Sequence, residues 1–149
     1  MPRELTVCAV LMIAGLNVAS GQKVQPEIRL DVLGPRTPSI EPGVGVNVAL
    51  GYYVRLGIAG GFNVRRGDAL NGSSWRGDVL ARFTFDPFRQ QRWALSVGGG
   101  LSFRRQTYLA AVADLEGPET HGFVAAIQAG VSGGPRGAVI LRRAVRGRR

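Results

Sequence analysis

Apolar and polar residues alternate along most of this chain. In residues 93–103 every second position is a large apolar residue or glycine, whereas the positions between them hold only alanine, serine and glycine. Successive side chains of a β-strand point to opposite faces, so this period of two residues predicts a strand with one apolar face and one face of small side chains.

The same period recurs in eight segments that are separated by turn-forming sequences. Glycine, proline, asparagine and aspartate gather in residues 34–43, 65–74, 86–92, 116–122 and 132–137, and these residue types mark turns. Most connections are too short for a parallel crossover, which needs a dozen or more residues, so neighbouring strands are expected to be antiparallel. The predicted strands cover residues 27–32, 43–50, 52–64, 75–86, 93–103, 107–115, 122–131 and 137–143.

The difference between the two faces favours an up-and-down closed barrel whose apolar side chains point outward. The interior of an eight-stranded barrel is only just wide enough for side chains to fill, which suits the row of small residues. Tilted strands of about 9 to 11 residues span a bilayer, and rings at both ends of the apolar row are typical of the aromatic girdles of membrane barrels. The predicted lipid-boundary aromatics are Tyr52, Phe62, Trp75, Phe85, Trp93 and Phe103.

Several charged residues fall on the predicted inward row. Buried charges are costly unless they are paired, so these residues are expected to form a network of Arg–Asp pairs that fills the lumen. An anion-lined pore or ligand cavity is the alternative, but eight strands leave little room for it. The predicted network consists of Arg55, Arg76, Asp78, Arg82, Asp86 and Arg104.

The chain divides into three parts by composition. Residues 1–21 have an early arginine, a short apolar run and then small residues, which is the layout of a signal peptide. The only cysteine, Cys8, lies in this leader, so the exported chain is expected to have no thiol chemistry. Residues 22–143 form the predicted barrel, and residues 144–149 form a basic tail. The net charge is +9, and five arginines in the last eight residues leave +4 for the rest of the chain.

Candidate chemistry is sparse. His121 is the only histidine, and nothing marks a nucleophilic serine to accompany it. One histidine without a cysteine supports no metal site, and no cofactor is expected. The arginine-rich tail is interpreted as a solvated segment or a weak contact with lipid phosphate, not as a site for nucleic acid.

The leader, the eight alternating strands and glycine-rich centres such as SVGGGLSF resemble the small eight-stranded outer-membrane β-barrels of diderm bacteria, of which the OmpA membrane domain is an example. The resemblance implies an outer-membrane location, with membrane lipids and the barrel-assembly machinery as partners. It also implies a structural or surface-interaction role without catalytic activity. With both termini periplasmic, loops 34–43, 65–74 and 132–137 would face outside, together with a short connection at 104–106.

Two other functions stay open at this level. One is a secreted soluble β-barrel or sandwich that binds a small apolar ligand. The other is a membrane-embedded lipid-modifying enzyme that uses His121.

Overall fold

The computed structural model describes residues 24–34, 38–63, 75–87 and 92–144. The predicted signal peptide, the loop at 65–74 and residues 145–149 of the predicted tail lie outside the described residues.

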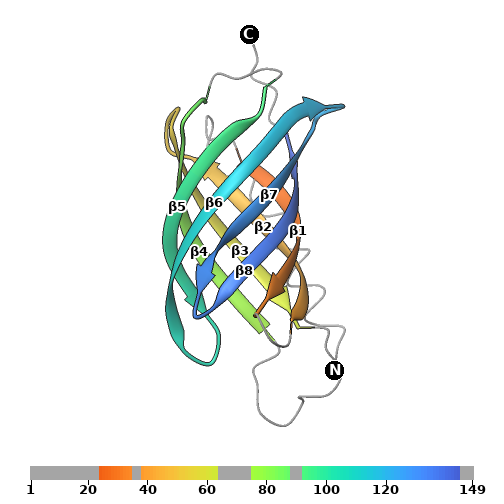
Figure 1. The fold of residues 1–149 in the computed structure, drawn as a ribbon. Coiled ribbons are helices and arrows are strands. Elements are labelled where there is room, and N and C mark those ends of the chain that lie inside the picture. The colour runs from red at the N-terminus through yellow and green to blue at the C-terminus, as the bar shows by residue number, and fades with distance from the viewer. Residues whose placement is uncertain (1–23, 35–37, 64–74, 88–91, 145–149) are drawn as a thin grey trace.

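Eight antiparallel strands form a closed barrel in which each strand pairs with its neighbours in sequence and the last pairs with the first (Figure 1). This architecture confirms the prediction of an up-and-down eight-stranded barrel. The strands are β1 (Val24–Leu33), β2 (Ser39–Ala49), β3 (Val54–Phe62), β4 (Trp75–Thr84), β5 (Ala94–Phe103), β6 (Thr107–Thr120), β7 (Phe123–Ser132) and β8 (Pro135–Arg143).

The strand register keeps the two faces separate around the barrel. Between β4 and β5, Val79 lies opposite Leu101 on the outside, and Asp78 lies opposite Ser102 on the inside. Because the side-chain period is two, a slip of one residue would turn the whole charged row outward. The alternation in the sequence therefore excludes a slip of one residue between neighbouring strands.

The connections alternate between the two ends of the barrel. β2–β3, β4–β5 and β6–β7 are joined at the end where β1 starts and β8 finishes, here called the terminal end; the other four connections lie at the distal end (Figure 1). At the terminal end His121 (φ 52°) and Gly122 (φ 81°) separate β6 from β7. Positive φ at both positions is what a two-residue type I′ hairpin turn requires.

Three predicted turns are partly strand. β2 begins at Ser39, with Pro42 opposite Leu30, and β6 continues to Thr120 through a register shift between Glu116 and Glu119. β8 already starts at Pro135. Glycine and proline in these segments indicate turns, but both residues are also tolerated at strand irregularities and strand starts.

Candidate functional site: a charged lumen inside an apolar belt

The outer surface of the barrel is apolar on every strand. Tyr52 is 73% exposed, Val79 37% and Leu101 40%, which confirms that the apolar row points outward. Exposed apolar side chains of the eight strands include Ile28, Val44, Ile58, Val79, Leu101, Leu109, Ile127 and Val139. We call this surface the apolar belt. Along the described chain no helix has the length and apolarity needed to cross a bilayer.

The predicted boundary aromatics lie at both ends of this belt. Tyr52, Phe85 and Trp93 lie at the terminal end; Phe62, Trp75 and Phe103 lie at the distal end, where Phe103 is half-buried and the other two are exposed. Ten residue steps from Trp93 to Phe103 correspond to about 33 Å along a strand, or about 25 Å of height at the usual barrel tilt. That height matches the apolar band of outer-membrane barrels.

The inside of the barrel is filled with paired charges. Six arginines and six carboxylates form ion pairs of 3.2 Å or less within the lumen, and a seventh arginine, Arg104, forms a longer pair of 4.0 Å with Glu41 at the distal rim. All except Arg55 and Arg104 are buried. The paired residues are Arg29, Arg55, Arg76, Arg82, Arg136 and Arg142 with Glu27, Asp31, Glu41, Asp78, Asp114 and Glu116.

Arg142 of β8 is the centre of the cluster in the terminal half. Its guanidinium donates to Glu27 at 2.9 Å, to Asp114 at 3.0 Å and to Glu116. Arg82 lies 3.1 Å from Asp114, and Arg55 donates to Glu116 at 3.1 Å. Each carboxylate therefore has at least two cationic partners, since Glu27 also accepts from Arg29 at 3.2 Å.

Asp31 of β1 is the centre of the cluster in the distal half. It accepts two hydrogen bonds from Arg29, at 2.7 and 2.8 Å, one from Arg76 at 2.6 Å and one from Arg136 at 3.1 Å. Arg76 also donates to Glu41 at 2.7 Å, and Arg136 donates to Asp78 at 2.9 Å. Strands β1, β2, β4 and β8 are thereby tied together across the lumen.

Arg29 and Gln128 join the two clusters. Arg29 contacts both Glu27 and Asp31 and donates to the Gln128 side chain at 2.7 Å. Gln128 in turn donates to Asp114 at 2.6 Å. The result is one continuous polar network along the barrel axis, and paired, hydrogen-bonded charges of this kind are costly to disturb.

Glycines of the inward row make room for the guanidinium groups. A Cβ built on Gly57 would overlap Asn47 Oδ1 and lie 2.8 Å from Arg82 Nη1. A Cβ on Gly98 would overlap the backbone oxygen of Ala81 and lie 2.9 Å from Arg82 Cγ. The small side chains of the inward row therefore leave the space that the long arginine side chains occupy.

Five of the six predicted network residues lie in the lumen or at its ends. Arg76, Asp78 and Arg82 are buried in the lumen, and Arg55 and Arg104 lie half-buried toward its two ends. Asp86 differs from the prediction, because β4 ends at Thr84 and Asp86 is exposed beyond it. Strand alternation cannot place a residue after the strand has ended.

Most of the network was not singled out in the sequence. The missed ionic members are Glu27, Arg29, Asp31, Glu41, Asp114, Glu116, Arg136 and Arg142. For three of them the signal was present: in residues 27–32 the charged residues alternate with Ile28, Leu30 and Val32, so the rule that selected Arg76 and Asp78 also places Glu27, Arg29 and Asp31 inside.

His121 lies apart from this network. It is exposed in the β6–β7 turn, and its side chain makes no hydrogen bond or ion pair with any described residue. The lipid-modifying enzyme hypothesis requires a serine or carboxylate within hydrogen-bond reach of His121, and no such hydrogen bond or ion pair joins it to a described residue. No group of three or more potential metal ligands was found among them either.

Comparisons with known proteins bear on the fold. No family model and no curated protein matches the sequence. The N-terminal β-barrel domain of Pseudomonas aeruginosa OprF aligns with 82% of this chain and 96% of its own, at TM-score 0.58 and 16% identity. The alignment with Neisserial surface protein A covers 85% of this chain and 100% of that protein's chain, at TM-score 0.54 and 13% identity. The alignment with the de novo designed TMB2.3 covers 87% of this chain and 100% of the designed chain, at TM-score 0.63 and 13% identity. The chain thus has the eight-stranded barrel fold of outer-membrane proteins.

Proposed function

We propose that this chain is an outer-membrane β-barrel protein of a diderm bacterium, with a structural or surface-interaction role and no catalytic activity. The observation that carries the proposal is the apolar belt, because exposed apolar side chains occur on all eight strands. Soluble monomers rarely expose a contiguous apolar patch beyond a few hundred Å². The closed ladder also leaves no unpaired strand edge, which hydrocarbon requires.

The lumen network serves, in this proposal, as a stabilising plug. Its carboxylates are each held by at least one arginine, so it offers no open row of carboxylates to a passing ion. The plug would tie strands on opposite sides of the barrel together while lipid covers the exterior. We therefore expect no ion conductance from the reconstituted protein.

A soluble barrel that binds a small apolar ligand is disfavoured by the interior. Such a ligand needs a mainly apolar cavity, whereas the described lumen is lined by buried arginines and carboxylates. Membrane lipids would be the apolar partner instead, and the barrel-assembly machinery would insert the chain.

Fractionation of cells that express the full-length chain tests the location. We expect the protein in the outer-membrane fraction, with a gel mobility that changes on heating as a folded barrel opens. A monodisperse protein that stays soluble in the periplasm without detergent would refute the proposal.

Single-cysteine labelling tests the orientation. Gln106 is exposed in the β5–β6 connection at the distal end, and His121 is exposed at the terminal end. In intact cells a membrane-impermeant maleimide should label Gln106→Cys, and it should label His121→Cys only after the outer membrane is permeabilised. The reverse pattern would contradict the periplasmic placement of the termini while leaving the membrane location intact.

A further inference from the structure

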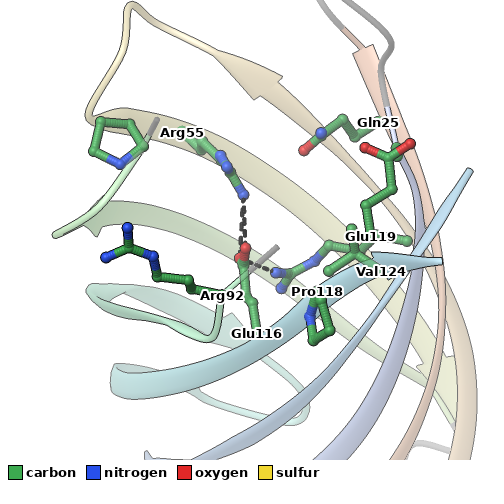
Figure 2. A pocket seen from close by; sticks show the side chains of 10 residues that line it. Gln25, Arg55, Arg92, Glu116, Pro118, Glu119 and Val124 are labelled. Atoms are coloured by element: carbon green, nitrogen blue, oxygen red, sulfur yellow. Dashed lines mark hydrogen bonds and ion pairs between the residues drawn. The ribbon is translucent and has the colours of Figure 1, made fainter. Parts of the chain in front are cut away.

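A small polar pocket opens at the terminal end of the barrel, separate from the apolar belt (Figure 2). Its volume is about 150 Å³, and its lining includes Gln25 near the start of β1 and Ala144 just after β8. A cavity of about this volume can hold a benzene molecule. The pocket therefore has room for a ligand of about six non-hydrogen atoms.

The charges around the pocket are separated in space. Figure 2 shows the guanidinium groups of Arg55 and Arg92 on one side and the carboxylate of Glu119 on the other, beside Gln25. Between them, Glu116 accepts hydrogen bonds from Arg142 and from Arg55 Nη1. The Glu116 charge is thereby engaged within the lumen network, and the pocket presents a cationic side and an anionic side.

We propose that this pocket binds a small zwitterion, a free amino acid of the size of glycine or alanine. The ligand carboxylate would lie toward Arg55 and Arg92, because a guanidinium matches a carboxylate with two parallel hydrogen bonds. The ligand ammonium would lie toward Glu119. A simple anion would be repelled by Glu119, and a simple cation by the arginines, so an ion with both charges complements the lining best. The proposal does not depend on the membrane location.

The side chain of Arg55 can serve both the network and a ligand. It is one-fifth exposed, and its recorded ion pair with Glu116 uses Nη1. Glu116 keeps Arg142 if Arg55 is replaced. Pro118 and Val124 also line the pocket and would contact the aliphatic part of the ligand.

Titration of the full chain in nonionic detergent tests the proposal, with glycine, alanine and acetate as separate ligands and backbone amide chemical shifts as the signal. We expect saturable shifts near the pocket, with tighter binding of the amino acids than of acetate. Arg55→Gln should weaken all three ligands about tenfold or more, as for loss of a charged hydrogen bond. Glu119→Gln should weaken the amino acids but strengthen acetate by up to about fivefold, because one like charge is removed.

Arg105→Gln is the matched control, because Arg105 is an exposed arginine in the distal β5–β6 connection. It should leave all three affinities unchanged. Absence of saturable binding, tighter binding of acetate than of alanine, or a Glu119→Gln effect of the same sign on acetate and alanine would each overturn the proposal. The heat-dependent gel mobility of each variant confirms that it is folded. If the protein proved soluble, the same titration without detergent would still decide the question.

Discussion

Replacement of Asp31 by asparagine tests whether the lumen network stabilises the barrel. Asp31 is completely buried and accepts four hydrogen bonds from three arginines. Asparagine keeps the shape, but it removes the charge and turns an amide donor toward a guanidinium donor. The lumen network loses one of its six negative charges, so its excess of positive charge rises by one.

The expected cost is about 3–5 kcal/mol of unfolding free energy, the range for breaking a buried ion pair by removing one partner. The four hydrogen bonds to a charged group would sum to more than this. However, Arg76 keeps Glu41 and Arg136 keeps Asp78, so the loss should stay within the range for one broken pair.

Urea unfolding in lipid vesicles measures the effect. Asp86→Asn is the matched control, because Asp86 is exposed beyond β4, and it should not change the unfolding free energy. The double variant Asp31→Asn with Arg136→Met removes one charge of each sign, so the net charge of the network is unchanged, and it should be less destabilised than the sum of the single variants. If Asp31→Asn were as stable as Asp86→Asn, the network would not be a stabilising plug.

Three further predictions follow from the two faces and the turns. Gly98→Ala, whose Cβ would press on the backbone oxygen of Ala81 and on Arg82, should destabilise the barrel by about 1–3 kcal/mol. Gly60→Ala, whose Cβ would have only Arg76 O at 3.6 Å, should be nearly neutral in the same urea assay. Ile58→Arg places a charge midway along β3 on the apolar belt and should lower the unfolding free energy in vesicles by about 2–4 kcal/mol. Thr107→Arg, at the distal end, should lower it by at most about 1 kcal/mol. Equal losses for the two variants would contradict the presence of lipid around the belt. His121→Asn should stabilise the type I′ turn by up to about 1 kcal/mol, because asparagine adopts positive φ more readily; a lower urea midpoint would contradict that turn assignment.

The fold could be predicted because one rule decides it. Strict alternation with small residues on one row leaves a narrow barrel as the consistent solution, and residues such as Val79 and Leu101 then have to face outward. The same rule failed where a strand ended or was irregular: Asp86 lies two residues beyond Thr84, and β6 continues past Leu115. Alternation assigns a face only while the strand lasts.

The pairing partners inside the lumen could not be predicted in this way. Alternation indicates that Arg29 and Gln128 both point inward, but they are 99 residues apart, and their contact depends on the relative height of β1 and β7. That height is set by the shear of the closed barrel, which no short stretch of sequence encodes. The Arg142 contacts with Glu27 and Asp114 depend on the same quantity.

The ladder between β1 and β8 joins the two extremes of the described chain, from Glu27 opposite Arg142 to Leu33 opposite Arg136. This seam can form only after all intervening strands have been synthesised, since its partners are more than one hundred residues apart. Until then the outer edges of β1 and of the last completed strand have no pairing partner, and Glu27 lacks its counterion from β8. Cylinder formation is thus a late, long-range step with a high loop-closure entropy, and a polypeptide that stopped before β8 would lack both the seam and Arg142.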